Sequence, residues 1–288
     1  MKRIKRILLG LVWALAFPVR FILVSRKYVE SPIRWEEEKN DIIERANWLC
    51  DKVIVTPKSL LKNMPSILGD YYGGQWAIYS CSMLTAALYN ISRIYPEEKE
   101  QNIQRIERLI DIVLSPELRE YDRLNKAKTI WRHKSTGLLK SKLPTKKKTK
   151  RRTLRGSYSA LNCYYLSLID PEFAESQYYS LVKAFYSDDS EDIFGGIHEY
   201  LQKRPRFKLD VDAGPIVFGL SASGTAFAIG AATFFNDWKT RSKLLHTAEI
   251  AGQTVKRKHT RHYRLGELVI VGEATTLAMR TNINKDSQ

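Results

Sequence analysis

The joints between successive helical segments of this chain are very short, and this feature constrains the fold most. Tyr95-Pro96-Glu97-Glu98, Asp170-Pro171-Glu172 and Asn236-Asp237 each end one apolar periodic segment and begin the next. Proline in the first turn of a helix and an acidic side chain near the positive end of its dipole are typical of helix starts. Because such short joints make neighbouring helices run antiparallel, the sequence predicts a protein built from αα-hairpins.

Helical periodicity covers most of the chain after residue 31. Apolar residues recur at three- and four-residue spacing, as at Ile103, Ile106 and Ile110. Strand-type alternation is scarce, and a hairpin around 254–263 is the one candidate. We therefore expect an all-α fold of αα-hairpins arranged as an (α/α) toroid or a curved helical array. About nine helices are expected, at 36–54, 75–94, 97–114, 124–134, 156–169, 171–186, 216–235, 238–252 and 262–281, with a weaker one near 191–203.

Positive charge is concentrated in one segment of the chain. The formal net charge is +16, yet residues 123–155 alone contain fourteen basic residues and no acid. A nucleic-acid-binding protein usually spreads its basic residues over a folded face, so no nucleic-acid partner is expected. The run at 146–152 is interpreted as part of a solvated basic loop at 140–155, with contact to an anionic lipid or polymer as the alternative.

Residues 1–31 are predicted to form a signal or membrane-anchor segment. Four basic residues precede an apolar run of 18 residues, Ile7 to Val24, which is just long enough to cross a bilayer of ~30 Å. Pro18 and Arg20 interrupt the run, so a cleaved signal peptide is the alternative to a span. The excess of basic residues before the run favours an extracytoplasmic body.

We therefore expect a membrane-attached protein whose partners include membrane lipids. Beyond the anchor, the sequence predicts a single helical domain at 32–282 and a polar tail at 283–288. The nearly uncharged stretch at 213–236 is interpreted as a buried core helix. A second membrane span is the minor alternative, and it is disfavoured because the helices that follow have the pattern of soluble, amphipathic helices.

Cysteine and histidine patterns indicate neither a metal nor a cofactor. Cys50, Cys81 and Cys163 are far apart and lack the spacing of a zinc site or a disulfide framework. For each of them, a small buried apolar role is favoured over a nucleophilic one. Nucleotide-binding loops and the serine-hydrolase elbow are also missing from the sequence.

Two carboxylates, Asp210 and Asp212, stand directly before Gly214-Pro215 and an apolar segment rich in small residues. In an extended segment, side chains two apart face the same side, so one acid could donate and the other accept a proton if their pKa values differ. The alternatives are that Asp212 caps a helix beginning near Pro215 and that Asp210 is an ordinary surface acid.

Two further groups complete the candidate chemistry. Asp70 and Tyr72 lie before two glycines and a helix expected from Gln75, where aromatic walls would suit a sugar, isoprenoid or other amphiphile; a packed loop is the alternative. Glu273 interrupts an apolar helix, so burial with a partner such as Arg280 or His262 is favoured over exposure.

Four motifs resemble a family of uncharacterised bacterial, membrane-anchored, all-helical proteins. They are Gln75-Trp76-Ala77-Ile78-Tyr79-Ser80-Cys81-Ser82-Met83, Ser115-Pro116-Glu117-Leu118-Arg119-Glu120-Tyr121-Asp122, Gly156-Ser157-Tyr158-Ser159-Ala160-Leu161-Asn162-Cys163-Tyr164-Tyr165 and Asp210-Val211-Asp212-Ala213-Gly214-Pro215. That family is remotely similar to the linalool dehydratase–isomerase type of (α/α) toroid. The family carries a long segment after Tyr121-Asp122 that is missing here, which implies a shortened member and an incomplete toroid.

Taken together, these residues predict a membrane-tethered toroid-like protein. The first hypothesis is a lyase, isomerase or glycan-active enzyme with general acid–base chemistry by Asp210, Asp212, Tyr72 and Glu273. The second is a non-catalytic envelope protein that binds a lipid or glycan, and the third is a shortened domain completed by a partner protein. The residues expected to bind the small amphiphilic or glycan ligand are Asp70, Gln75, Trp76, Tyr79, Tyr158 and Cys163.

Overall fold

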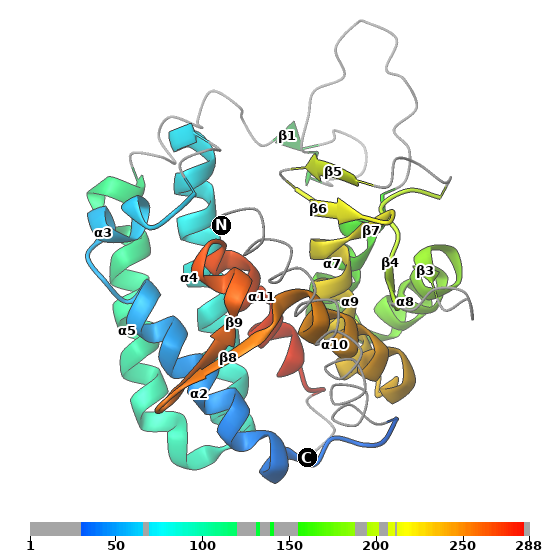
Figure 1. The fold of residues 1–288 in the computed structure, drawn as a ribbon, viewed down its shortest axis with the longest axis horizontal. Coiled ribbons are helices and arrows are strands. Elements are labelled where there is room, and N and C mark those ends of the chain that lie inside the picture. The colour runs from blue at the N-terminus through cyan, green and yellow to red at the C-terminus, as the bar shows by residue number, and fades with distance from the viewer. Residues whose placement is uncertain are drawn as a thin grey trace, which may run out of the picture.

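The fold is seen in a computed structural model (Figure 1). It describes residues 30–65, 69–119, 131–132, 139–140, 155–187, 195–201, 207–210 and 212–284. In these ranges no helix combines the length and the apolar character needed to span a bilayer. The expected anchor at 7–24, the tail beyond 284 and most of the basic segment at 123–155 lie outside the described residues.

The described chain is mostly helical, as predicted. Three of the expected joints are confirmed, and the helices predicted at 156–169 and 238–252 begin and end at those residues. The helices are α2 (Trp35–Val53), α3 (Pro57–Lys62), α4 (Gly69–Ile94), α5 (Lys99–Leu114), α7 (Gly156–Ile169), α8 (Pro171–Phe185), α9 (Ala222–Phe234), α10 (Trp238–Gly252) and α11 (Ile270–Arg280), with the 3-10 turns η2 (Pro96–Glu98) and η3 (Arg264–Glu267).

Short antiparallel strands occupy several positions between the helices. The expected hairpin at 254–263 is confirmed as β8 (Thr254–Arg257) paired with β9 (Thr260–Tyr263). The strands that the sequence did not predict are β1 (Trp131–Arg132), β2 (Leu139–Lys140), β3 (Tyr186–Ser187), β4 (Gly196–Ile197), β5 (Phe207–Asp210), β6 (Gly214–Val217) and β7 (Leu220–Ser221).

The predicted helix at 216–235 begins too early, because its first residues form strands in the structure. β5, β6 and β7 form a three-stranded antiparallel sheet, and α9 begins only at Ala222. Phe218 and Gly219 turn the chain between β6 and β7 with φ values of 53° and 85°, which no helix tolerates. The cap of α9 is the side chain of Ser221, which accepts a hydrogen bond from the Gly224 amide. Asp212 does not cap this helix, and a 13-residue α9 is too short to be a membrane span.

Four other predicted helices are also corrected. The one at 262–281 starts with β9 and η3, so α11 covers only its last part. The one at 124–134 contains β1 and the weak one at 191–203 contains β4, where the structure describes them. The helix predicted from Gln75 begins earlier, at Gly69, and includes Gly73 and Gly74.

The helices pack as consecutive pairs around an inner row. α4 contacts α5, α7 contacts α8, and α9 contacts α10, as expected of αα-hairpins. The inner row runs α4, α11, α9, α7 (Figure 1), with α2 packed on both α4 and α11. The small residues of α9 allow this close packing: a Cβ on Gly230 would lie 2.3 Å from the Sδ of Met279 in α11. The α9 residues form the centre of the core.

Candidate functional site

Arg155 is the centre of a charged cluster at the start of α7. We call the Arg155 cluster the group Arg155, Tyr158, Glu199, Asp210 and Asp212. Arg155 immediately precedes the helix in an extended conformation, and its Nη2 donates to Asp210 Oδ1 at 2.8 Å. Its Nε donates to the carboxylate of Glu199, and its guanidinium lies 4.9 Å from the centre of the Tyr158 ring. One cation therefore joins α7, β5 and the segment after β4.

Glu199 anchors the cluster from inside the protein. It is fully buried, and its carboxylate accepts hydrogen bonds from the amide and hydroxyl of Ser157, at 3.3 and 3.0 Å. A carboxylate at this position satisfies free amides of the first helical turn and lies at the positive end of the helix dipole. Gly156 permits the segment at His198 and Glu199 to lie directly against the start of α7, since a Cβ at position 156 would lie 2.0 Å from the backbone oxygen of His198.

Asp210 is held as an anion by its surroundings. Besides Arg155, its Oδ1 accepts hydrogen bonds from the backbone amides of Asp212 and Ala213 at 3.1 and 3.0 Å. Burial alone would raise the pKa of Asp210, but the Ala213 amide and the Arg155 guanidinium together hold it below its usual value. The carboxylate that ends β5 therefore closes the β5–β6 turn and orients Arg155.

Asp212 and Tyr158 form the accessible part of the cluster. The Tyr158 hydroxyl donates to Asp212 Oδ2 at 2.7 Å, and Arg155 Nη1 lies 3.8 Å from the same oxygen. The Asp212 side chain is 51% exposed, against 15% for Asp210. Partial burial and the bond to Asp212 raise the pKa of Tyr158. Tyr158 and Asp212 thus present an aromatic ring and a carboxylate to solvent, and Arg155 beneath them holds both in place.

A lysine and a second tyrosine lie beside this pair. The Nζ of Lys208 in β5 lies 3.8 Å from Asp210 Oδ2, donates to the Tyr200 hydroxyl at 3.3 Å and lies 5.9 Å from the centre of the Tyr200 ring. The backbones of Tyr200 and Arg155 form an isolated antiparallel β-bridge. The cluster and its rim therefore combine two aromatic rings with cations and carboxylates.

Glu273 belongs to a different, buried network. Its Oε1 accepts from Arg45 Nη1 at 2.7 Å, and its Oε2 accepts from the Tyr263 amide at 2.7 Å. The predicted burial is confirmed. The carboxylate forms an ion pair with Arg45, whereas the expected partners have other acids beside them: Arg280 pairs with Glu38 and Asp41, and His262 contacts Glu267. The contacts of Glu273 come from α2 and β9, and none comes from the Arg155 cluster, so Glu273 is not brought together with Asp210 and Asp212.

The network around Arg45 connects α2 to the C-terminal elements. Arg45 Nε also pairs with Asp41 Oδ2 at 3.2 Å, and its Nη2 donates to Thr254 Oγ1 at 2.6 Å. Arg280 Nη1 lies 2.6 Å from Asp41 Oδ2. Buried charges arranged in this way are mutually compensated and hold elements in register. We therefore assign these residues a structural role.

The candidates on α4 are dispersed along that helix. Trp76 and Tyr79 are partly buried and pack against the core, whereas Gln75 is exposed and Tyr72 is half-buried. Burial raises the pKa of Tyr79, which shares a side-chain hydrogen bond with Tyr165 of α7. The side chain of Asp70 lies outside the described residues. Tyr79 is thus a contact between the first and last helices of the inner row.

Cys163 lies in the core and not at the surface cluster. It is 2% exposed, and burial raises its pKa to about 11, so the thiol is protonated and shielded. The small apolar role favoured for it is confirmed by this burial. Among the described residues, no three His, Cys, Asp or Glu side chains are grouped to hold a metal ion.

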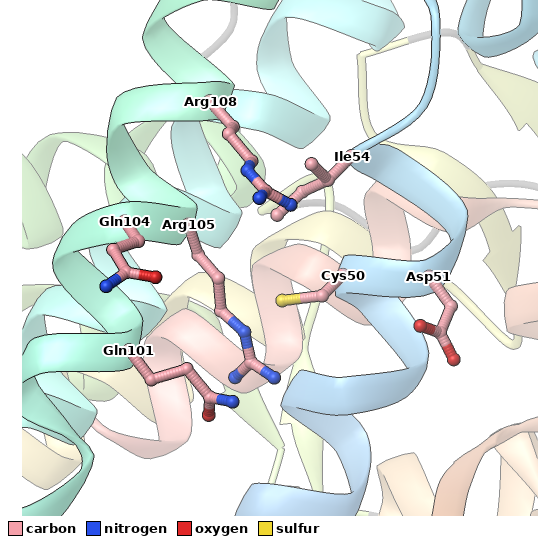
Figure 2. A pocket seen from close by; sticks show the side chains of 7 residues that line it. All are labelled: Cys50, Asp51, Ile54, Gln101, Gln104, Arg105 and Arg108. Atoms are coloured by element: carbon pink, nitrogen blue, oxygen red, sulfur yellow. The ribbon is translucent and has the colours of Figure 1, made fainter.

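A hollow of about 460 Å³ lies between α2 and α5 (Figure 2). Arg105 and Arg108 project into it from α5, opposite Cys50 of α2. Arg105 already donates to Asn47 Oδ1 at 2.8 Å, and burial raises the pKa of Cys50 to about 11. The hollow contains none of the predicted site residues, and its remaining lining residues are Asp51, Ile54, Gln101 and Gln104.

Comparison with protein-family models, curated proteins and solved structures finds no match to this chain. The residues of the Arg155 cluster therefore carry the functional argument by themselves. Sequence reasoning named Asp210, Asp212 and Tyr158 but missed Arg155 and Glu199. Arg155 is hidden in a run of basic residues, and Glu199 had no sequence signal, because its role depends on a contact 42 positions away.

Proposed function

We propose that this protein is a membrane-tethered, helical binding protein that recognises a hydroxyl-rich ligand, such as a glycan, at the Arg155 cluster. The observation that carries the proposal is the half-exposed Tyr158–Asp212 pair, fixed from below by Arg155 and the buried Glu199. A rigid pair of this kind keeps its geometry without a ligand, which lowers the entropy cost of binding.

The chemistry of the cluster suits sugar hydroxyls. Asp212 offers carboxylate oxygens as acceptors, Lys208 offers an ammonium donor, and the Tyr158 ring offers an apolar face. Sugars present hydroxyl donors and acceptors together with an apolar ring face, so these groups complement them.

Binding is favoured over the acid–base mechanism with four catalytic residues. Asp210 is committed to Arg155 and two backbone amides, which hold it ionised. Glu273 is committed to Arg45 in a separate network. A pair of acids with divergent pKa values, which that mechanism requires, therefore lacks support.

We further propose that the helical row is the remaining arc of an (α/α) toroid, attached to a membrane through residues 7–24 with its body outside the cytoplasm. Exposed apolar side chains support the shortened form, because they occur on the two helices that flank the segment at 120–154. They are Ile103, Ile110 and Leu114 on α5 and Tyr165, Leu168 and Ile169 on α7. A partner protein could cover these faces.

One observation favours a second candidate, an acid–base enzyme that uses two residues, Tyr158 and Asp212, in place of the four predicted. The 2.7 Å hydrogen bond from the Tyr158 hydroxyl to Asp212 is a geometry in which the phenol oxygen accepts a proton from a substrate while its own proton passes to the carboxylate. In this reading, the Tyr158–Asp212 pair is the general base.

Thermal melts with a glycan panel test both candidates. A bound ligand raises the melting temperature of the protein, and we expect this rise to disappear in Asp212→Asn and to persist in the control Asp111→Asn, an exposed acid on α5. The second candidate is supported if Tyr158→Phe keeps the rise but abolishes conversion of the glycan. A panel in which no glycan raises the melting temperature of the wild type contradicts the proposal.

A further inference from the structure

The hollow between α2 and α5 forms because these two helices share a neighbour and do not pack closely on each other. Both pack on α4, and no comparable packing joins α2 directly to α5, although both helices are fully described. The α5 residues that line the hollow are spaced three or four apart, so they share one face of the helix. They are Gln101, Gln104, Arg105 and Arg108. The α5 wall of the hollow is therefore rich in hydrogen-bond donors, and two of its side chains are cations.

Arg105 is held in place by amide oxygens that carry no charge. Its Nη2 donates to Asn47 Oδ1 of α2 at 2.8 Å, and its Nη1 donates to Asn102 Oδ1 at 3.4 Å. Asn102 is 1% exposed, and its amide nitrogen donates in turn to the Leu88 carbonyl and the Ser92 hydroxyl. A buried side chain thus orients the guanidinium. No carboxylate of the described residues pairs with Arg105, so its positive charge is left uncompensated.

Arg108 adds a second guanidinium one turn further along α5. It is exposed, and within the part of the chain that the structure describes it forms no ion pair or hydrogen bond. The acid that lines the hollow, Asp51, points its carboxylate away from both guanidinium groups (Figure 2). Burial raises the pKa of Cys50, opposite Arg105, to about 11, so its thiol is uncharged. Two cations therefore face the same space without an anion between them.

Two guanidinium groups on one wall complement a phosphate monoester in shape and in charge. Each guanidinium is a planar fork that donates two parallel hydrogen bonds to an oxyanion. A phosphate monoester carries a charge of about −1.5 to −2 at pH 7, which matches two guanidinium groups, whereas a single carboxylate leaves one of them uncompensated. The hollow of about 460 Å³ lies within the range of about 300–1,000 Å³ that is typical of small-molecule sites. The phosphate is therefore one part of a larger ligand.

We propose that the hollow between α2 and α5 binds a small phosphorylated molecule, whose phosphate is held by Arg105 and Arg108. Gln101 and Gln104, on the same face of α5, offer amide donors and acceptors to hydroxyl groups on the rest of the ligand. This site is separate from the Arg155 cluster, because no residue of that cluster lines the hollow. Neither proposal therefore depends on the other.

Isothermal titration calorimetry of the full chain in a non-ionic detergent, at fixed ionic strength, tests the proposal. The probes are inorganic phosphate, glucose 6-phosphate, glucuronate, which carries one carboxylate, and glucose. We expect glucose 6-phosphate to bind more tightly than inorganic phosphate, because the hollow also contacts the sugar. Glucuronate should bind at least about tenfold more weakly than glucose 6-phosphate. Glucose alone measures any recognition of hydroxyl groups elsewhere on the protein.

Two variants locate the binding in the hollow. Arg108→Gln removes an exposed charge without a partner among the described residues, so the fold should be unaffected while the affinity for glucose 6-phosphate falls at least about tenfold. Gln104→Glu places a carboxylate one turn before Arg108, where the two side chains can pair. It should abolish phosphate binding without lowering the melting temperature. Lys99→Gln, which removes an exposed charge of α5 outside the hollow, is the matched control.

Equal affinity for glucose 6-phosphate in the wild type and in Arg108→Gln overturns the proposal, because the phosphate is then held elsewhere, for example by the basic segment at 123–155. An equal loss in Lys99→Gln and Arg108→Gln also overturns it, since net charge alone then attracts the probe. Glucuronate that binds as tightly as glucose 6-phosphate contradicts the choice of phosphate. If neither inorganic phosphate nor glucose 6-phosphate binds, the site itself is refuted, and the glycan site at the Arg155 cluster is unaffected.

Discussion

The side chains of Arg45 and Glu273 form a 2.7 Å ion pair inside the protein, although 228 positions separate them in the chain. The pair joins α2, the first described helix, to α11, the last one. Burial alone would lower the pKa of Arg45, but Tyr263, Glu273 and Asp41 raise it, so the guanidinium is charged at every physiological pH. The pair therefore connects the first and the last helix of the described chain.

Glu273→Gln should destabilise the protein severely. Removing one charge of a buried pair leaves the other without full compensation, which typically costs about 3–5 kcal/mol. Urea unfolding followed by circular dichroism measures the loss of free energy. Glu267→Gln, at a half-exposed carboxylate that pairs with Arg257 and His262, is the matched control and should change stability far less. Equal losses in the two variants would contradict the structural role of Glu273.

Asp210→Asn should lower stability in a pH-dependent way. The pKa of Asp210 is lower in the folded protein than its usual value, so its charge stabilises the fold above the unfolded pKa of about 3.9. That stabilisation is lost as the pH falls through the folded pKa. Melting temperatures measured from pH 7 downward should show a full gap between wild type and variant near neutrality, and the gap should close below about pH 4. A gap that stays constant with pH would argue against the ion pair with Arg155.

Gly156→Ala and Gly73→Ala should have opposite effects, although both glycines lie in helices. A Cβ at position 156 would lie 2.0 Å from the His198 oxygen, whereas a Cβ at position 73 would lie 3.7 Å from Met64 Cβ, an ordinary van der Waals distance. We expect the first variant to unfold at a clearly lower temperature. The second should gain up to about 1 kcal/mol, because alanine loses less conformational entropy in a helix. Melting curves of the two variants distinguish this from a general intolerance to alanine.

Phe218→Asn should stabilise the fold. Asparagine before Gly219 suits a turn with two positive φ values and relieves about 1 kcal/mol of strain. Chemical denaturation measures the gain in the free energy of unfolding. A variant that is less stable than the wild type would show that the Phe218 ring serves the fold itself.

The helical part of the fold could be predicted because it is encoded locally. Joints such as Asp170-Pro171 carry their own caps: the Asp170 side chain accepts a hydrogen bond from the Phe173 amide, a signal visible in the sequence. The start of α9 could not be predicted in this way. The apolar run through 214–221 is compatible with either a helix or strands, and pairing with β5 decides between them.

The candidate site was predictable only in its exposed half. Asp210, Asp212 and Tyr158 stand out as polar or aromatic residues in distinctive motifs. The residues that organise them, Arg155 and Glu199, act through long-range contacts, which composition and spacing do not record. The assignment of Glu273 to the same site was an inference from residue type alone, and the network around Arg45 explains why its carboxylate is buried.

The position of Glu199 also has a consequence for the order of folding. The first turn of α7 obtains its carboxylate cap from a residue 42 positions further along the chain. The intervening loop must close before that cap can form, and its closure carries an entropy cost that grows with loop length. We therefore expect the beginning of α7 to form late, and Arg155 leaves the ribosome well before its acidic partners Glu199, Asp210 and Asp212 have been synthesised. During that interval the nascent chain exposes an uncompensated cation at the end of its most basic segment.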